Sequence, residues 1–354
     1  MSIGEDYKKC NEWRVNKMRF ISCASYYGSG SSAITDFVSE FDSVYSFTDE
    51  EFRFVQDPDG ISDLEYNLVE NFNRHNSGHS IKRYKKLVNF YCGNIFGSKY
   101  EKFFHGNWKK YSEEYINALT DFTYHGWWQY DLLDKGDFFY FRKRILNKIL
   151  KMTIWRTQPE RTLNTMKNEI TYCAHPSEEK FLNCTKKYIE DLFGSVCQGA
   201  NTVMVDQIVP PTNLKRYLRY FNDIKVFIVD RDPRDIFVLE KYVWRDGVIP
   251  LNVEEFCKWF KYTREHRLTE QVNTDQVRFI QFEDMIYRYE ETAQKISDWL
   301  GLDLNEQNKK KQYFNPERSR ENTHTWKKIK CDMKEIEYIE HELKEYLYTF
   351  PEEC

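Results

Sequence analysis

Short apolar runs alternate with longer segments of helical periodicity at both ends of the chain. Apolar runs bounded by turn-forming residues predict buried strands at 18–24, 51–55, 201–207, 224–230 and 277–284. Helical patterns lie between these runs, for example at 212–221 and 253–268. Strands that alternate with helices favour an α/β fold, here a P-loop-like parallel sheet of about five strands flanked by helices.

The pattern changes between about 75 and 195, where the chain becomes aromatic, locally basic and mostly helix-like. No Pro- or Ser-rich linker bounds this part, and a strand pattern resumes after it. We therefore expect one α/β domain over 1–354 with a helical insertion at 75–195, a candidate acceptor-binding region. At the C-terminus, 333–350 predicts an amphipathic helix whose apolar face carries Ile336, Ile339, Leu343 and Leu347.

Composition narrows the classes of function. The chain has 354 residues, 41% of them hydrophobic, and a net charge of −4, which indicates a globular protein and argues against a global nucleic-acid binder. No apolar run reaches the ~18 residues of a transmembrane segment. Nine scattered cysteines without a C-x-x-C pair suggest reduced thiols and a cytoplasmic protein. We expect no metal site: in HNSGH, 75–79, two histidines lie four residues apart, but the Ser and Gly between them fit a turn better than a helix.

A glycine- and serine-rich loop follows the first predicted strand. In FISCASYYGSGSSAITDFVSEF, 20–41, an apolar run ends in Gly28, Ser29, Gly30, Ser31 and Ser32, and a helical pattern then begins. Glycines let a backbone approach a phosphate, and N–H groups at the start of a helix bind anions. The alternative is a Gly/Ser turn with a serine cap. The loop is not a Walker A motif, because the Gly-Lys-Ser/Thr ending is absent.

A second stretch, IKVFIVDRDPRDIFVLEKYVW at 224–244, contains a strand, a charged turn and a helix. Helix capping and dipole effects explain Asp232, Pro233 and Asp235. They do not explain Arg231, a cation in the turn at the carboxyl end of a predicted buried strand. Because ligands of open α/β sheets bind at that edge, Arg231 is a candidate anion ligand.

These segments resemble the cofactor-binding segments of sulfotransferases that use 3′-phosphoadenosine 5′-phosphosulfate (PAPS). Two later stretches also resemble that family: VRFIQFEDMIYRYEETAQKISDWLGL at 277–302, and FNPERSRENTHTWKK at 314–328, which carries its Ser-x-x-Asn-x-x-x-Trp pattern. The stretch at 205–226, VDQIVPPTNLKRYLRYFNDIKV, is similar to the segment that precedes the fourth strand in that family. The resemblance covers both ends of the chain and skips most of 60–195.

The resemblance implies roles for individual residues. Residues 28–32 would hold the 5′-phosphosulfate of PAPS, the expected donor, and Arg231 would bind its 3′-phosphate. Asn322, Trp326 and Lys327 would close over the nucleotide. The alternatives are a core aromatic for Trp326 and a solvated surface position for Lys327.

The sequence departs from the family pattern at two positions. Gly28 stands where most members have Lys or Arg before the Ser-Gly pair, and Leu239 stands where many have Ser. Either Arg234, Lys241 or Lys327 supplies the missing charge, or the chain is a divergent or inactive member.

Sulfuryl transfer needs a general base near the acceptor hydroxyl. The carbohydrate-sulfating relatives often carry a glutamate at the position that Glu51 matches, and the alternative is a solvated strand edge. Asp206, His105 and His125 are competing candidates. In the insertion, the aromatic residues of YHGWWQYD, 124–131, suit either a sugar or a helical core cluster.

The resemblance thus predicts sulfuryl transfer to a carbohydrate or glycolipid acceptor. Two other functions remain open. One is a P-loop kinase that uses Mg-ATP, in which Asp230 would mimic the Walker B aspartate. The other is a non-catalytic nucleotide-binding subunit of polysaccharide synthesis.

Overall fold

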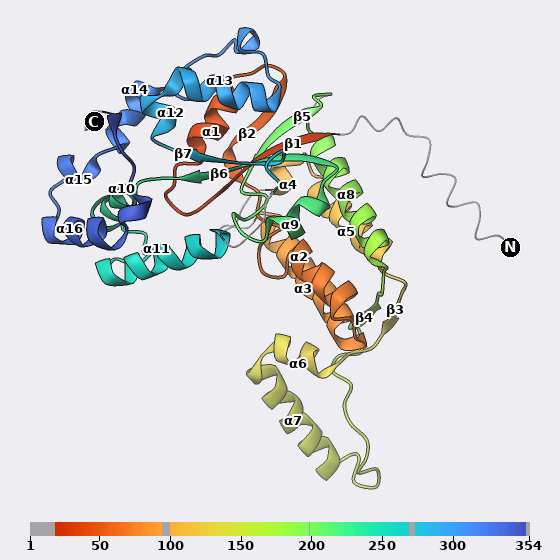
Figure 1. Ribbon diagram of the computed structural model, residues 1–354. Helices are drawn as coiled ribbons and strands as arrows, with labels where there is room; N and C mark the ends of the chain where they lie inside the picture. The colour runs from red at the N-terminus through yellow and green to blue at the C-terminus, as the bar shows by residue number, and fades with distance from the viewer. Residues whose placement is uncertain (1–17, 94–99, 198, 269–272, 352–354) are drawn as a thin grey trace. The chain divides into compact units, whose positions relative to one another are not determined.

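The computed structural model describes residues 18–93, 100–197, 199–268 and 273–351. It divides into two compact units, one formed by 1–56 with 197–354 and the other by 57–196. The second unit begins earlier in the chain than the insertion expected at 75, and it ends next to the expected boundary. Figure 1 shows the helices and strands of the chain, coloured from the N-terminus to the C-terminus.

The first unit contains a five-stranded sheet in the order β2-β5-β1-β6-β7, in which every neighbouring pair is parallel. Its strands are β1 (Arg19–Ser25), β2 (Val44–Glu51), β5 (Thr202–Asp206), β6 (Asp223–Asp230) and β7 (Val277–Gln281). The predicted parallel α/β fold is therefore confirmed. Four of the five strands coincide with predicted runs.

The second strand was predicted in the wrong place. The expected strand 51–55 is mostly loop, and β2 occupies the residues before it. Phe52, Phe54 and Val55 are fully buried, so their apolar character reflects loop packing rather than strand pairing. Only Glu51 belongs to both the expected and the observed strand.

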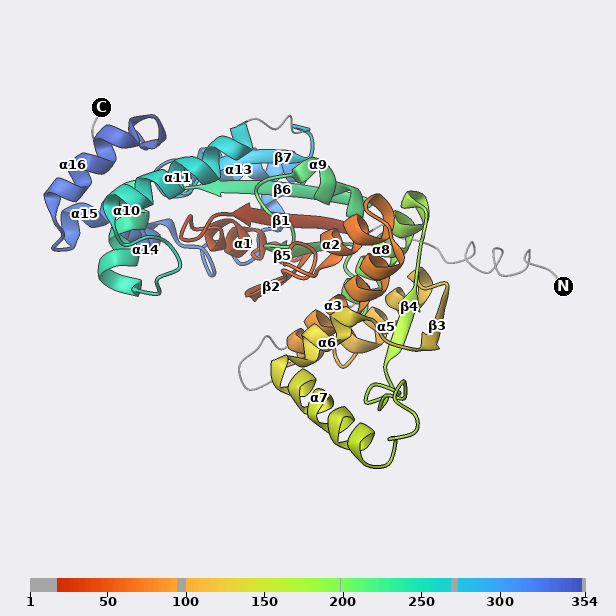
Figure 2. The same cartoon turned by 90° about the horizontal axis from the view of Figure 1, so that it is seen from below.

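Helices cover both faces of the sheet (Figures 1 and 2). α1 (Ser32–Val38) and α13 (Tyr289–Leu300) share one apolar cluster with β1 and β6. On the other face, α10 (Pro233–Val238), α11 (Val253–Leu268) and α16 (Met333–Glu342) share a second cluster. Shorter helices complete the unit: α9 (Leu214–Tyr217), α12 (Asp284–Tyr287), α14 (Pro316–Ser319) and α15 (Thr325–Lys328).

The C-terminal helix is shorter than predicted, because α16 ends at Glu342. Ile336, Ile339 and Leu343 are buried as the periodicity indicates, whereas Leu347 lies beyond the helix and is partly exposed.

The second unit is mostly helical. It contains α2 (Ile61–Glu65), α3 (Arg74–Tyr91), α4 (Tyr100–Phe103), α5 (Trp108–Leu119), α6 (Gln129–Lys135), α7 (Asp137–Met152) and α8 (Glu178–Gly194). An antiparallel ribbon joins β3 (Phe122–His125) to β4 (Ile170–Cys173). HNSGH lies inside α3 rather than in a turn, because Asn73 caps that helix by accepting from the N–H groups of His75 and Asn76. Among the described residues, no helix is long and apolar enough to cross a bilayer.

Candidate functional site

A pocket lies at the carboxyl edge of the sheet, where two chain connections diverge. The connection after β1 leads through α1 to β2 on one side, while the connection after β6 leads to β7 on the other. Such a divergence leaves a crevice between neighbouring strands, which is where ligands of open parallel sheets bind. A cavity of 820 Å³ occupies this position, lined by the loop after β1, the ends of β2 and β5, and residues following β6 and β7.

The glycine-serine loop forms one wall of the pocket. Gly28 and Gly30 adopt φ of +74° and +83°, a left-handed region that favours glycine. Among the described residues, no acceptor receives the N–H groups of Gly30, Ser31 or Ser32. Ser29 is fully buried and its hydroxyl makes no hydrogen bond. Because an unsatisfied buried polar group is costly, the Ser29 hydroxyl points to a bound polar ligand, and the three N–H groups of the more exposed residues beside it could bind the same ligand.

The space around the two glycines is also restricted. A Cβ at Gly30 would lie 2.5 Å from the Phe282 ring, and one at Gly28 would lie 3.1 Å from the Trp244 ring. Phe282 and Trp244 both line the pocket and come from segments distant in the sequence. Glycine is therefore required at position 30 by close packing as well as by backbone conformation.

Arg231 connects the loop after β6 to two other segments of the pocket. Its Nη1 donates to the carbonyl oxygen of Gly28 over 3.1 Å, and its Nη2 donates to the carbonyl oxygen of Asn322. The guanidinium lies 4.7 Å from the centre of the Phe282 ring. Arg231 is 4% exposed, and its Nε has no partner. The structure thus places a buried cation, with one nitrogen that has no hydrogen-bond partner among the described residues, against the glycine loop.

Glu283 is fully buried, and its carboxyl group lies close enough to Arg231 for the two charges to interact. Its Oε1 accepts from the N–H of Asp232 over 2.9 Å, while Oε2 has no partner. Burial, and secondly the charge of Asp232, raises the pKa of Glu283 to about 8, although Arg231 acts in the opposite direction. The carboxyl is therefore mostly protonated at neutral pH.

Two carboxylates meet at the opposite wall of the pocket. Glu51 and Asp206 occupy paired positions at the ends of β2 and β5, and both line the cavity. Burial, and secondly the charge of Glu51, raises the pKa of Asp206 to about 7. The Ser31 hydroxyl donates to Oδ2 of Asp206 over 3.4 Å, and Oδ1 is buried without a partner. Asp206 therefore titrates near neutral pH next to the glycine loop.

Gln207 and Arg53 are polar residues of the pocket that were not predicted from the sequence. Gln207 adopts φ of +57°, donates from its side chain to Ser25 and receives the Gln56 amide on its carbonyl oxygen. Arg53 lies 3.7 Å from Glu51 and adds a second cation to the lining. No local motif marks these positions, because strand pairing and loop folding bring them together.

The segment 314–328 contributes only one of its three predicted ligands to the pocket. Asn322 lines the cavity, but Trp326 and Lys327 do not. Trp326 is 4% exposed and packs in a core cluster with Val238 and Phe350. Lys327 is exposed. The core interpretation of Trp326 and the surface interpretation of Lys327 thus describe the structure.

Two residues proposed to supply the positive charge that is missing at Gly28 form ion pairs outside the pocket. Arg234 pairs with Asp232 and with Glu340, each over 2.8 Å, and stacks on the Trp326 ring. Lys241 pairs with Glu335 over 2.5 Å. Among the described residues, Arg53 and Arg231 are the only arginines and lysines that line the cavity.

Asp230, the last residue of β6, is held by two arginines of α11. Arg264 donates to Oδ1 over 2.9 Å, and Arg267 donates to Oδ2 over 2.7 Å. Arg264 is fully buried. Both carboxylate oxygens are therefore neutralised by guanidinium groups, which makes Asp230 a poor ligand for Mg²⁺.

His105, His125 and the aromatic stretch 124–131 belong to the second unit. The stretch does not form a buried core cluster. Its two tryptophans are half-buried, with Lys143 4.1 Å from the Trp127 ring and Arg74 4.4 Å from the Trp128 ring.

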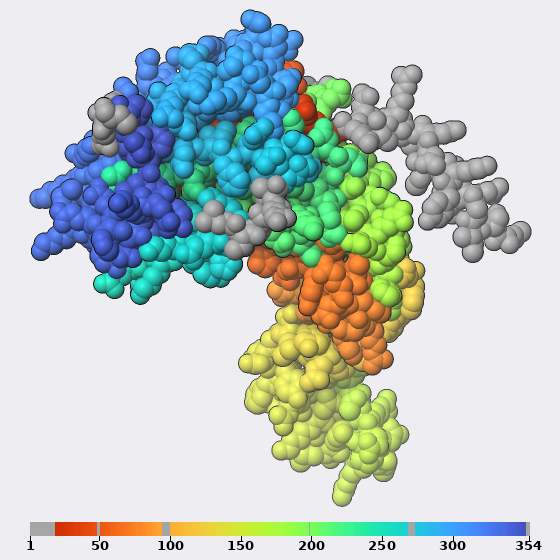
Figure 3. Space-filling model, viewed as in Figure 1, coloured from red at the N-terminus to blue at the C-terminus, as the bar shows by residue number. Residues whose placement is uncertain are grey.

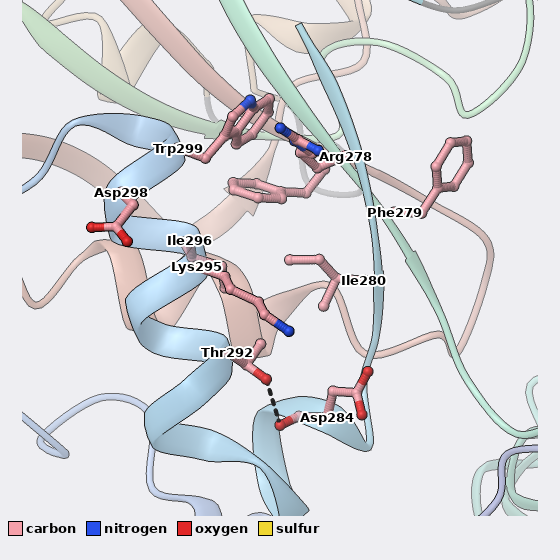
Figure 4. A pocket seen from close by; sticks show the side chains of 10 residues that line it. Arg278, Phe279, Ile280, Asp284, Thr292, Lys295, Ile296, Asp298 and Trp299 are labelled. Atoms are coloured by element: carbon pink, nitrogen blue, oxygen red, sulfur yellow. Dashed lines mark hydrogen bonds between the residues drawn. The ribbon is translucent and has the colours of Figure 1, made fainter. Parts of the chain in front are cut away.

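A second hollow, of 580 Å³, lies between β7 and α13 (Figure 4). Arg278 and Phe279 come from the strand, while Thr292, Lys295 and Trp299 come from the helix. Thr292 donates to the backbone oxygen of Asp284 over 3.1 Å. This hollow lies along an edge strand and contains neither the glycine loop nor the Glu51–Asp206 pair.

Comparisons with known proteins give weak similarity to sulfotransferases of known structure. The sulfotransferase domain from the curacin biosynthetic pathway is 13% identical with a TM-score of 0.41, covering 96% of this chain and 100% of that one. Sulfotransferase STF9 from Mycobacterium avium is 12% identical with a TM-score of 0.37, covering 98% and 80%. STF1 from Mycobacterium tuberculosis H37Rv is 11% identical with a TM-score of 0.35, covering 87% and 77%.

No protein-family model matches the chain, and no curated protein matches it. Similarity at this level supports no inference about function.

Proposed function

We propose that the chain transfers the sulfuryl group of PAPS to a hydroxyl of a carbohydrate or glycolipid acceptor. One observation carries the proposal: a single cavity joins a glycine-serine loop with N–H groups unpaired in the described part of the chain, a buried arginine and a carboxyl group whose pKa is raised to about 7. Anion-binding groups and a positioned base are what transfer of a sulfuryl group to a hydroxyl requires.

The residues present fit the donor. The unsatisfied N–H groups of Gly30, Ser31 and Ser32 and the orphan hydroxyl of Ser29 would bind the phosphosulfate end. Arg231 would place its unused Nε donor toward the 3′-phosphate while its other nitrogens fix the loops. PAPS would supply an activated sulfuryl group on a phosphate leaving group.

The pocket also offers an apolar surface for the adenine. The Trp244 ring is 37% exposed, lines the cavity and is held edge-on by Tyr27, with ring centres 5.8 Å apart. An exposed, fixed indole is a suitable stacking surface for a flat base.

Asp206 and Glu51 are the proposed acid–base pair. Asp206 lines the cavity and has a pKa near the pH at which a general base works best. Glu51 is half-exposed at the rim, and its charge helps to hold that pKa high. Between the two, we favour Asp206 as the base and Glu51 as the group that tunes it.

The kinase alternative loses its main support in the structure. A Mg-ATP enzyme would use Asp230 at the metal, but Arg264 and Arg267 occupy both of its oxygens. The loop also lacks the lysine that P-loop enzymes place on the β- and γ-phosphates.

Calorimetric titration tests the proposal directly. The protein should bind adenosine 3′,5′-bisphosphate without added metal, and Mg-ATP more weakly by tenfold or more. A chain that binds Mg-ATP in a metal-dependent way and does not bind the bisphosphate would refute the proposal. Binding of the bisphosphate without sulfuryl transfer to a panel of sugar hydroxyls would favour a non-catalytic nucleotide-binding subunit.

A further inference from the structure

Helix α7 of the second unit carries a continuous apolar stripe on its outer side. Phe138, Phe141, Ile145, Ile149 and Met152 follow one another at spacings of three and four residues, so they lie on one face. Their exposed fractions are 78%, 61%, 43%, 52% and 69%. No residue of α7 is buried. Scattered exposed apolar residues are ordinary, but five in one stripe indicate a surface that meets something.

The opposite side of α7 already has neighbours. Phe139, Lys143 and Leu150 are partly buried there, and the Lys143 ammonium lies 4.1 Å from the Trp127 ring. The Asn147 side chain accepts from the N–H of Leu163 over 2.6 Å. The helix is therefore held in its unit by one face, and the apolar stripe is the other face. Figure 3 draws the segment that contains α7 in space-filling form, coloured yellow to yellow-green.

Basic residues border the stripe. Between residues 137 and 156 the chain has six basic residues and one acidic residue, in a protein whose net charge is −4. Arg142, Arg144 and Lys148 are exposed. None of the carboxylates that the structure describes forms an ion pair with these three side chains. Their positive charge is thus concentrated beside the apolar stripe and is not neutralised within the described part of the chain.

We propose that α7 docks on an anionic lipid surface, with its apolar stripe among the acyl chains and its basic border among the headgroups. An amphipathic helix that lies in a membrane interface has this combination of a large apolar face and Lys/Arg on its borders. Anionic headgroups attract basic residues within about a Debye length, so the two contributions act together. The proposal rests on α7 alone and not on the function of the pocket.

The charge on α7 favours an anionic bilayer over two other binding partners, a second copy of the chain and a nucleic acid. A second copy of the chain, pairing stripe to stripe, would bring Arg142, Arg144 and Lys148 of both copies together, which like-charge repulsion opposes. A nucleic acid would satisfy the basic border but would leave Phe138, Phe141 and Ile149 in water. An anionic bilayer satisfies both the charged border and the apolar stripe.

Vesicle co-sedimentation of the full chain tests the proposal. We expect binding to phosphatidylcholine vesicles containing about one third phosphatidylglycerol to be at least tenfold tighter than binding to phosphatidylcholine alone, and to weaken as salt is raised. The triple variant Phe138→Ser, Ile145→Ser, Ile149→Ser should lose at least tenfold in affinity. Because these side chains are exposed, the variant should retain the wild-type melting temperature.

Matched controls separate docking from a general loss of apolar surface or charge. Tyr262→Ser on α11, at a residue 64% exposed, should bind the vesicles as the wild type does. The variant Arg142→Gln, Arg144→Gln, Lys148→Gln should lose the preference for phosphatidylglycerol. The variant Lys102→Gln, Lys109→Gln, Lys110→Gln, which removes three exposed lysines of the same unit, should keep it.

Two outcomes would overturn the proposal. The first is no binding to the anionic vesicles at low salt, or binding that the two α7 variants leave unchanged. The second is a concentration-dependent dimer in sedimentation velocity that the triple serine variant abolishes, without vesicle binding, which would make the stripe a self-association surface.

Discussion

Glu51 and Asp206 occupy paired positions at the ends of neighbouring parallel strands, and the charge of Glu51 helps to raise the pKa of Asp206 to about 7. Glu51 lies close enough to Asp206 to affect the pKa of Asp206, but the two residues differ in burial, because Asp206 is 9% exposed and Glu51 lies at the rim. Because of this difference in burial, substitution of Glu51 and substitution of Asp206 should change the pH dependence of the rate in different ways.

If Asp206 is the base, sulfuryl transfer should rise with pH through about 7, because only the carboxylate accepts a proton. Asp206→Asn should lower the rate by a hundredfold or more while leaving bisphosphate affinity nearly unchanged. Glu51→Gln removes a charge that raises the pKa of Asp206, so the rise should move to lower pH. A pH–rate profile that Glu51→Gln reduces uniformly, without moving its midpoint, would instead make Glu51 the base.

Arg231→Ala should weaken binding of adenosine 3′,5′-bisphosphate far more than binding of adenosine 5′-phosphosulfate, which lacks the 3′-phosphate. Loss of a charge-assisted contact is worth about 1.5–3 kcal/mol, so we expect at least a tenfold difference by calorimetry. Arg278→Ala, at an exposed arginine outside the pocket, should change neither affinity. Equal losses for the two ligands would show that Arg231 acts only by holding Gly28 and Asn322.

Gly30→Ala should weaken bisphosphate binding, because its Cβ would lie 2.5 Å from the Phe282 ring and would displace the loop. Gly247→Ala is a matched control. Gly247 also has a left-handed backbone, with φ of +71°, but its Cβ would contact nothing within 4 Å. Both variants should lose about 1–2 kcal/mol of stability from backbone strain. Gly30→Ala alone should lose more than this, and it alone should lose nucleotide affinity. Unchanged bisphosphate affinity in Gly30→Ala would mean that the loop does not hold the nucleotide.

Glu283 makes stability depend on pH. Its pKa is raised in the folded protein to about 8, so between pH 4.5 and 8 the folded state binds more protons than the unfolded state. The free energy of unfolding should therefore fall as the pH rises through this window. Glu283→Gln should flatten the fall and stabilise the protein at pH 8 by a few kcal/mol, because the shift from 4.5 to about 8 is about 3.5 pKa units at about 1.4 kcal/mol each.

Denaturant unfolding at pH 5.5 and pH 8 measures this difference. Asp206 also contributes in the same direction, because its pKa is raised to about 7, so some slope should remain in the Glu283→Gln variant. A Glu283→Gln variant as unstable at pH 8 as the wild type would contradict the assignment.

Much of the sheet could be predicted from sequence, because buried parallel strands leave continuous apolar runs such as 224–230. The second strand was misplaced for a physical reason. Phe52 and Phe54 are as apolar as strand residues but are buried in a loop, whereas the sequence of Val44–Glu51, VYSFTDEE, ends in four polar residues and forms no apolar run. Burial and strand pairing are separate properties, and a short apolar run reports only burial.

The candidate site was predictable where one segment supplies a local signal, and not where folding joins distant segments. The glycine loop, Arg231, Glu51 and Asp206 all line the pocket. Trp326 does not, because an aromatic residue in a ligand loop and one in a core have the same local pattern. Arg53, Gln207 and Trp244 carry no motif, since their neighbours in the pocket come from other parts of the chain.

The order of the strands also has a consequence for how the protein is made. β1, the central strand, is synthesised first, but its partners β5 and β6 begin at Thr202 and Asp223. The helical unit, in contrast, is one continuous stretch of chain and has left the ribosome before either partner strand. During synthesis, the nascent chain must keep Arg19–Ser25 unpaired and shielded until almost two hundred further residues have followed. Pairing of β1 with β5 and β6 joins distant parts of the chain and is therefore slow. A ribosome-associated chaperone would be most useful before this pairing is complete, while β1 is still exposed.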